Sequence, residues 1–303
     1  MGTPQFAVPV LEKLISKYDV IMVVSQPDRE KDRKGNIIFS PIKELAISNN
    51  IEVYQPEKIR KEYQKIVDLN PDLIVTCAYG QIIPEVILNC PKYGCINVHG
   101  SLLPKLRGGA PIQHAIIDGY NETGMTIMYM DKGMDTGDII SMESIPILDS
   151  DNYDSLHDKL SILGAELLMR TLPSIIEGTN DRIKQDESLV TFGYNISKED
   201  EKIDFNLSSR EVFNKIRGLS SVPGSYCLLN NLRMKVYESF ITDEDSSSEC
   251  GKIVRIDKTG IYVNTLDKVI RLTDIKLEGK KRCKVSDFVN GVKKEEYEGV
   301  VLN

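Results

Sequence analysis

The first half of the chain alternates short apolar runs with stretches whose apolar residues recur at helical spacing. The apolar runs are rich in β-branched residues and are typical of buried strands, whereas the stretches between them predict helices. Ser40 followed by Pro41 is a typical helix start, with a side-chain cap and then proline at the first position. The strands predicted in this way are 20–25, 51–54 and 72–77, and the helices are 9–17, 41–48 and 57–68.

The same alternation continues to about residue 190. Strands are predicted at 94–99, 125–130 and 138–145, and a long amphipathic helix at 154–176. Strands that alternate with helices form βαβ units with right-handed crossovers. We therefore expect an α/β fold with a doubly wound, mostly parallel, Rossmann-like sheet over residues 1–190.

The pattern changes beyond a polar stretch that we interpret as a linker at 191–204. Ser208 and Glu211 form a capping box that opens a short helix. Short strands separated by turn signals follow at 224–229, 233–240, 252–256, 261–265 and 269–272. Strands at this spacing predict a small OB-like β-barrel as a second domain, residues 205–303, with the acidic stretch 242–249 as a loop.

Composition excludes several classes of protein. The chain has a net charge of −7, and it holds no run of the ~18 apolar residues that a membrane helix needs. The six cysteines form no CxxC pair and no export signal precedes them, so we expect reduced thiols, no metal site and a cytoplasmic protein. Residues 196–303 carry 19 basic and 18 acidic side chains, against 19 and 27 in residues 1–195. The second domain is therefore the more basic part.

Candidate chemistry is concentrated in two stretches. The chain has no dinucleotide-binding GxGxxG and no phosphate-binding P-loop. Asn97 and His99 stand two residues apart at the end of a predicted strand, so they project from the same face. The carboxyl ends of strands in an open α/β sheet are where ligands bind. Asp135 lies in a glycine-containing loop between two later strands and is a candidate to join them.

An amide, an imidazole and a carboxylate suit acyl transfer to an amine. The amide and imidazole can stabilise the negative charge on an attacked carbonyl oxygen, and the carboxylate can orient the imidazole or assist proton removal. The same residue types also occur in ordinary turns, where they hydrogen-bond their own backbone. The residues alone leave both interpretations open.

Longer motifs resolve this choice. Asn97-x-His99-Gly100-Ser101-Leu102-Leu103-Pro104, Arg107-Gly108-Gly109-Ala110-Pro111 and Met130-Asp131-x-Gly133-x-Asp135-Thr136-Gly137-Asp138 strongly resemble the 10-formyltetrahydrofolate-dependent formyltransferases. Further matches, among them Gly2-Thr3-Pro4, Ser25-Gln26-Pro27-Asp28-Arg29 and Ser197-Lys198-Glu199, extend the resemblance over nearly the whole chain. They are most similar to the branch of the family whose acceptor is the methionyl amino group on initiator tRNA.

The resemblance implies roles for these residues. Asn97, His99 and Asp135 match the family's catalytic residues, and the formyl donor would be 10-formyltetrahydrofolate, with no metal. The folate-contacting segment of the family matches Ser101, Leu102, Leu103 and Pro104, with Asp131 beside it. The implied partners are the folate and initiator methionyl-tRNA, and we expect a monomer that does not engage a membrane.

The resemblance also implies contacts with tRNA. The family carries an inserted loop where this chain has residues 28–39, and Arg33 falls at the place of an important arginine. The second domain of the family presents basic residues to tRNA, which makes Arg217, Lys280, Lys281 and Arg282 candidates for phosphate contacts. Such contacts would position the RNA without reading its sequence. The alternative for each of them is an ordinary solvated charge.

Two other functions remain open at this point: a formyltransferase for a small amine, such as glycinamide ribonucleotide or an amino-sugar nucleotide, and a non-catalytic tRNA- or folate-binding protein. One departure from the family bears on the second. Family members begin with a strand that leads into Gly2-Thr3-Pro4, whereas this sequence starts at Met1. We therefore expect the first, central strand to be missing, through a misplaced start or a truncation, with apolar surface exposed and stability reduced.

Overall fold

A computed structural model describes residues 1–29 and 34–303 of the chain. These residues divide into two compact units. The first unit comprises Met1–Pro111, Glu122–Pro146 and His157–Tyr194, and the second comprises Ile112–Asn121, Ile147–Leu156 and Asn195–Asn303. The second unit thus includes two short segments that the expected domain boundary assigns to the first domain. Among the described residues, no helix has the length and apolar character needed to span a bilayer.

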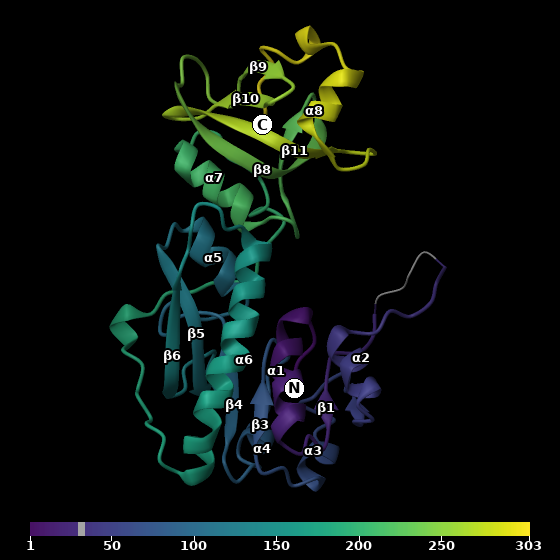
Figure 1. Ribbon diagram of the computed structural model, residues 1–303, viewed down its shortest axis with the longest axis vertical. Coiled ribbons are helices and arrows are strands. Elements are labelled where there is room, and N and C mark those ends of the chain that lie inside the picture. The colour runs from purple at the N-terminus through teal and green to yellow at the C-terminus, as the bar shows by residue number, and fades with distance from the viewer. Residues whose placement is uncertain (30–33) are drawn as a thin grey trace. The chain divides into compact units, whose positions relative to one another are not determined.

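The first unit holds two sheets (Figure 1). β1 (Val23–Val24) pairs in parallel with β2 (Val53–Tyr54). The larger sheet has the order β3 (Ile74–Thr76), β4 (Cys95–His99), β5 (Glu122–Tyr129) and β6 (Ile139–Pro146). The β3–β4 pair is parallel, and the pairs β4–β5 and β5–β6 are antiparallel. The predicted α/β class is confirmed, with the antiparallel pairs toward the β6 edge.

Helices alternate with these strands. They are α1 (Val8–Lys17), α2 (Pro41–Ser48), α3 (Gln64–Asp68), α4 (Glu85–Leu88), α5 (Pro111–Ile117) and α6 (Tyr153–Glu177). α2 begins as predicted, with the Ser40 hydroxyl accepting from the Lys43 amide. The helix predicted at 57–68 is wrong over its first half. Helix α3 begins only at Gln64, and before it the Lys58 carbonyl accepts from the amides of Lys61 and Glu62 in a single turn.

A groove lies between β1 and β3, and we call it the β1–β3 groove. It has a volume of about 640 Å³, and its lining includes Val20, Met22, Leu73, Val75, Leu172 and Ile176. Within the described part of the chain, the backbones of residues 20–22 and of Leu73 form no hydrogen bonds. The predicted strand 20–25 is correspondingly reduced to two residues. Within the described residues, the facing sides of β1 and β3 are therefore open over this groove.

Met1 and Gly2 occupy one end of this groove. The Gly2 amide donates to the Val24 carbonyl at 3.0 Å, and the Met1 carbonyl accepts from the Cys77 amide at 2.9 Å. The two residues therefore bridge β1 and the end of β3. The Met1 ammonium donates to the Val75 carbonyl at 2.6 Å, and its burial lowers the pKa of this amine. An ionisable amine thus lies where apolar side chains would otherwise be favoured, and burial there disfavours its charged form.

The second unit begins its regular structure with α7 (Ser209–Gly218), which carries the predicted capping box of Ser208 and Glu211. An antiparallel sheet follows in the order β7-β8-β11-β10-β9, with β12 on β11. Its elements are β7 (Ser225–Leu229), β8 (Leu232–Asp245), β9 (Ile253–Asp257), β10 (Gly260–Asn264), β11 (Lys268–Leu277), β12 (Cys283–Lys284) and α8 (Val285–Phe288). Residues 299–303 hydrogen-bond Ile253 of β9 and Leu228 of β7, so they join the two edges of the sheet.

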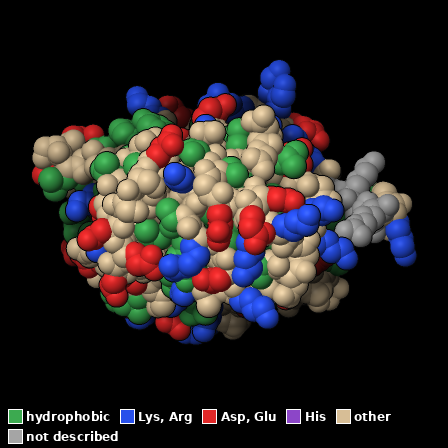
Figure 2. Space-filling view, turned by 90° about the horizontal axis from the view of Figure 1, so that it is seen from above, with side chains coloured by type: hydrophobic (Ala, Val, Ile, Leu, Met, Phe, Trp, Pro, Cys, Tyr) green, Lys and Arg blue, Asp and Glu red, His purple; other side chains and the backbone are tan. Residues whose placement is uncertain are grey.

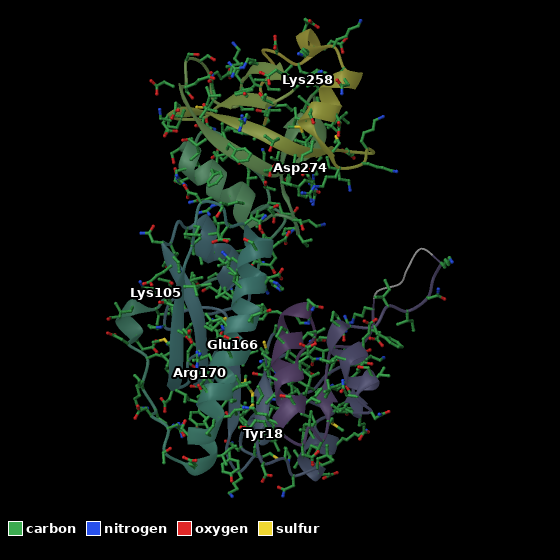
Figure 3. The ribbon with its side chains drawn as sticks, viewed as in Figure 1. Tyr18, Lys105, Glu166, Arg170, Lys258 and Asp274 are labelled. Carbon is green, nitrogen blue, oxygen red and sulfur yellow. The ribbon has the colours of Figure 1, made fainter. Side chains whose placement is uncertain are left out.

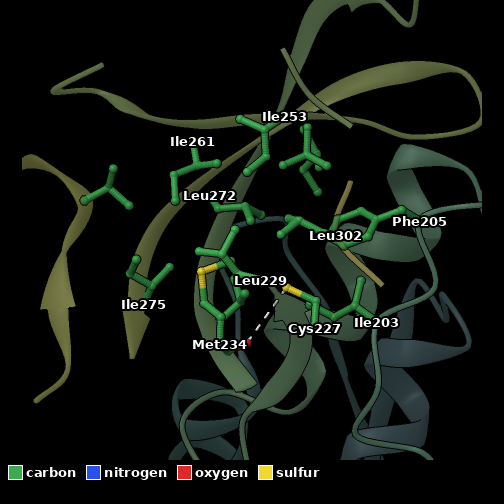
Figure 4. Packing of buried hydrophobic residues seen from close by; sticks show 14 of the residues in the cluster. Ile203, Phe205, Cys227, Leu229, Met234, Ile253, Ile261, Leu272, Ile275 and Leu302 are labelled. Carbon is green, nitrogen blue, oxygen red and sulfur yellow. Dashed lines mark hydrogen bonds between the residues drawn. The ribbon is translucent and has the colours of Figure 1, made fainter. Parts of the chain in front are cut away.

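The core of the second unit corrects two expectations (Figure 4). Ile203 and Phe205, at the end of the expected linker and just beyond it, are buried in this core. The acidic stretch expected as a loop continues β8 as far as Asp245, because residues 241–245 pair with β11 and the Lys268 ammonium contacts the Asp245 carboxylate at 3.0 Å. Charge pairing across the strands offsets the low strand propensity of the acidic residues.

The groove generates a prediction about stability. A chain extended before Met1 by five alternating Val and Ile residues should pair with β1 and β3 and move the buried ammonium away from Val75. Both effects favour the folded state, and each kcal/mol gained raises the melting temperature by about 2–4 °C in a chain of this size. Thermal unfolding followed by circular dichroism measures the difference. An extension of five Gly and Ser residues is the control, and equal melting temperatures for the two extended chains would contradict the prediction.

Candidate functional site

Strand β4 places two of the candidate residues side by side. Asn97 and His99 are two residues apart on β4, so their side chains project from the same face of the sheet. β4 is held on both sides, with Asn97 opposite Thr76 of β3 and His99 opposite Thr126 of β5. Asn97 is half-buried and His99 is 5% exposed. The structure therefore places the Asn97 amide and the His99 imidazole side by side, as predicted.

A neighbouring hydroxyl orients the Asn97 amide. The Thr76 hydroxyl donates to Asn97 Oδ1 at 2.8 Å. This contact engages the oxygen of the amide, so the NH₂ group points away from Thr76. Within residues 1–29 and 34–303, Asn97 Nδ2 donates no hydrogen bond. Asn97 therefore presents an N–H donor near the carboxyl end of β4. An oxygen atom that gains negative charge requires such a donor.

A backbone carbonyl fixes the protonation of the His99 ring. His99 Nε2 lies 3.1 Å from the Leu106 carbonyl oxygen. A carbonyl only accepts hydrogen bonds, so Nε2 carries the proton. His99 Nδ1 then faces Asp135, whose Oδ1 lies 3.8 Å away. The nitrogen that can exchange a proton is the one beside the carboxylate.

Asp135 is held by backbone contacts. Its Oδ2 accepts from the Gly108 amide at 2.9 Å, which leaves Oδ1 on the side of His99. Asp135 has a φ of 55°, a left-handed conformation that Asp tolerates better than most residues. Residues far apart in the sequence thus meet around His99, and the structure brings the three candidate residues into one place.

The candidate folate segment follows β4 directly. Thr126 accepts from the Leu103 amide at 3.2 Å and donates to the Ser101 carbonyl at 2.6 Å, which pins this segment to β5. Ser101 and Leu103 are buried, whereas Leu102 and Pro104 are half-buried. The side chains open to a ligand in this segment are those of Leu102 and Pro104.

Asp131 has a local role in its loop. Its Oδ1 accepts from the Gly133 amide at 2.9 Å and from the Thr136 hydroxyl at 2.6 Å. The side chain is exposed and caps its own turn. Asp131 thereby shapes the loop that carries Asp135.

The candidate tRNA contacts differ from one another. Arg33 lies outside the described residues. Lys280 and Lys281 are exposed in the turn between β11 and β12, and among the described residues neither has an ion-pair partner. Arg282 donates to both oxygens of Asp274, the residue labelled in Figure 3, and its guanidinium lies over the Tyr237 ring. Burial raises the pKa of Asp274, but hydrogen bonds from Arg282 and Lys284 outweigh it and lower that pKa.

Arg217 is buried in the second unit, with 8% of its surface exposed. It donates to the carbonyls of Leu148 and Asp151 and to Asn214 Oδ1. Burial lowers the pKa of this guanidinium. Its donors are committed to the backbone of the 148–151 turn, so a phosphate contact would require it to leave these partners.

Figure 2 shows that on the displayed face Lys and Arg side chains are interspersed with Asp and Glu.

Comparison with known proteins identifies the family. The pattern of the family described as "Formyl transferase" matches residues 1–172, and the pattern described as "Formyl transferase, C-terminal domain" matches residues 195–293. The chain belongs to the formyl transferase family.

Individual members of the formyl transferase family are similar over the full length. A methionyl-tRNA formyltransferase of Staphylococcus epidermidis is 50% identical over 305 residues, which cover 100% of this chain and 98% of that protein. One of Staphylococcus aureus is 49% identical over 294 residues, covering 96% and 94%. The structure of an N-formyltransferase from Helicobacter canadensis, in complex with folinic acid and dTDP-3-aminofucose, matches with a TM-score of 0.68 at 21% identity, covering 89% and 97%. The fold is thus shared beyond close relatives.

Formyl transfer fits the donor set of the site. A formyl group attacked by an amine gains negative charge on its oxygen, and the Asn97 Nδ2 group is a donor of the kind that such an oxygen requires. Sequence reasoning missed Thr76 and Leu106, although they orient those two side chains. Thr76 lies in a predicted strand without any distinguishing signal, and Leu106 acts only through its carbonyl. Arg107 and Gly108 belong to one of the motifs in the sequence, but the motif by itself indicates no role for either residue.

The Thr76 contact generates a prediction. Thr76→Val removes the hydroxyl but keeps the shape of the side chain, so Asn97 loses its orientation and formyl transfer should lose about tenfold in kcat, less than the 10²–10³ that loss of a whole oxyanion donor costs. The KM for the formyl donor should stay within about twofold. Steady-state kinetics checks both values. Thr123→Val, which removes another buried hydroxyl in the same unit, is the control, and equal kcat values for the two variants would refute the role of Thr76.

Proposed function

We propose that this protein transfers the formyl group of 10-formyltetrahydrofolate to the amino group of methionine on initiator tRNA, for the start of translation. The observation that carries the proposal is the convergence of Asn97, His99 and Asp135, with His99 Nδ1 3.8 Å from Asp135 Oδ1, in a chain about 50% identical to methionyl-tRNA formyltransferases. We further infer that it acts as a monomer in the cytoplasm, where translation takes place.

Each of the three residues has a distinct part in the reaction. Asn97 Nδ2 donates to the formyl oxygen while the amine attacks the formyl carbon. His99 Nδ1 donates to the same oxygen when the ring carries its second proton, because Nε2 is held by the Leu106 carbonyl. A free α-amine has a pKa of about 8, so part of it is already nucleophilic at neutral pH. Asp135 faces the protonated His99 Nδ1 and receives the proton that the attacking nitrogen loses. The new C–N bond forms, the bond from the formyl carbon to N10 breaks, and N10 takes up that same proton.

The segment after β4 is the proposed site for the folate. The half-buried side chains of Leu102 and Pro104 offer apolar contacts, while Ser101 and Leu103 anchor the segment in the core. Asp131 is proposed to act at one remove, by shaping the loop beside the reacting carbon.

For the tRNA, we propose Lys280 and Lys281 as phosphate contacts in the second unit. Both ammonium groups are exposed in one turn, and within residues 1–29 and 34–303 neither forms an ion pair, so both are available to a phosphate backbone. Arg282 is proposed to support this turn through Asp274, and Arg217 to shape the backbone of residues 148–151. Arg33 remains a candidate contact in the inserted loop.

The function is tested by offering the purified protein labelled formyl-folate together with one acceptor at a time. The acceptors are methionyl-tRNA, glycinamide ribonucleotide and an amino-sugar nucleotide. We expect label on methionyl-tRNA only, and His99→Ala should reduce its turnover by at least about 10² while folate affinity changes little. His114→Ala, on α5, is the control. Label on a small amine instead would assign a different acceptor, and label on none by a folded protein would favour a binding protein without catalysis.

The tRNA contacts generate a further prediction. The double variant K280A/K281A should raise the KM for methionyl-tRNA several-fold and make it less sensitive to salt, because fewer counterions are released on binding. Folate affinity should stay unchanged. Kinetics at two or three salt concentrations measures both effects. Lys258→Ala, an exposed lysine in another turn of the same sheet (Figure 3), is the control; if it raises KM as much as the double variant, the effect is one of net charge and not of this turn.

A further inference from the structure

Two polar side chains outside the catalytic residues form a connected pair in the first unit. Arg107 is 3% exposed, and its Nε and Nη2 donate to Gln185 Oε1 at 3.0 and 2.8 Å. Its Nη1 and Nη2 also donate to the carboxylate of Glu187. The Gln185 amide group then donates from Nε2 to the carbonyls of Asp135 and Gly137, both at 2.8 Å. A continuous chain of hydrogen bonds leads from a buried cation to the backbone of Asp135.

The backbone beside Arg107 contacts the same site from the other side. Leu106 accepts from His99 Nε2 through its carbonyl, and Gly108 donates to Asp135 through its amide. Arg107 therefore lies between the two residues that hold His99 and Asp135. Any shift of its side chain would move both neighbours, because the three residues are consecutive.

The stretch around Gln185 is tied to this loop by its backbone as well. Thr191 accepts from the Leu106 amide through its hydroxyl and from the Arg107 amide through its carbonyl, both at 2.9 Å. Gln185 is half-buried, whereas its neighbours from Asp181 to Lys184 and from Asp186 to Leu189 are exposed. Within this mostly exposed stretch, the half-buried Gln185 side chain reaches the loop of Asp135.

Only a side-chain amide meets the demands of this position. The guanidinium of Arg107 requires an acceptor, and the carbonyls of Asp135 and Gly137 require donors. Glutamine offers both within one planar group, whereas a carboxylate only accepts and an ammonium only donates. The residue type therefore follows from the contacts.

We propose that Gln185 is a positioning residue of the formyl-transfer site, which fixes the carboxylate of Asp135 beside His99 Nδ1 through the Asp135 backbone and through Arg107. This inference rests on the proposed function and deepens it. Gln185 touches no reacting atom. It holds the loop of residues 135–137 against residues 106–108, and so sets the distance at which the carboxylate meets the ring.

Two variants and a matched control test this role. Q185E keeps an acceptor for Arg107 but places carboxylate oxygens against two carbonyls, and Q185M removes all of these bonds at similar size. Both should lower kcat by about tenfold or more, with the KM for formyl-folate within about twofold. E187Q, which alters the exposed partner of the same arginine, should keep kcat within about twofold. A loss in E187Q equal to that in Q185E would assign the effect to the Arg107 charge and overturn the proposal.

A second measurement needs no substrate. The ¹⁵N chemical shift of His99 Nδ1, followed against pH, reports whether the carboxylate remains beside this nitrogen. The shift should change in Q185E and Q185M and should match the parent protein in E187Q, at temperatures below the melting point of every variant. An unchanged shift in the Gln185 variants would overturn the proposal even if kcat falls. If the parent protein formylates another amine, or none, the proposed function fails while this measurement still decides the role of Gln185.

Discussion

The hydrogen bond from His99 Nε2 to the Leu106 carbonyl determines how the whole site is organised. A backbone carbonyl has no proton to give, so the bond fixes the ring in one protonation pattern and directs Nδ1 to Asp135. Two residues further along, the Gly108 amide orients the carboxylate that Nδ1 meets. The chemistry of three side chains therefore depends on a short stretch of main chain, and on whatever keeps that stretch in place.

Much of the fold follows from the pattern of apolar residues. The alternation of strands and helices in the first half, and the short antiparallel strands in the second, were predicted because burial imposes those periodicities. The errors have local causes. β1 is short because the backbone of residues 20–22 makes no hydrogen bonds within the described part of the chain. Before α3 the chain forms only a single turn, which the Lys58 carbonyl closes. β8 is longer than predicted because Lys268 pairs with an acidic residue at its end.

The site was predictable to a different degree for each of its parts. Asn97 and His99 follow from a spacing of two on a strand that ends in glycine, Asp135 from its place in a glycine-containing loop between later strands, and the resemblance to known motifs supports all three. Gln185 gives no signal in the sequence, because its role depends on carbonyls 48 and 50 residues away. The number of basic residues in the sequence also does not show which of them are free to bind a ligand. Arg217 donates to backbone carbonyls, whereas Lys280 and Lys281 are exposed. Tertiary contacts decide which of several equivalent side chains is available to a ligand.

The bonds from residues 299–303 to β7 and β9 have a consequence for association between molecules. A strand at the edge of a sheet presents amides and carbonyls that can pair with a strand of another molecule. Here one segment covers part of both β7 and β9, so its release would uncover both strands at once. Residues 299–303 therefore protect the second unit against aggregation through its sheet edges.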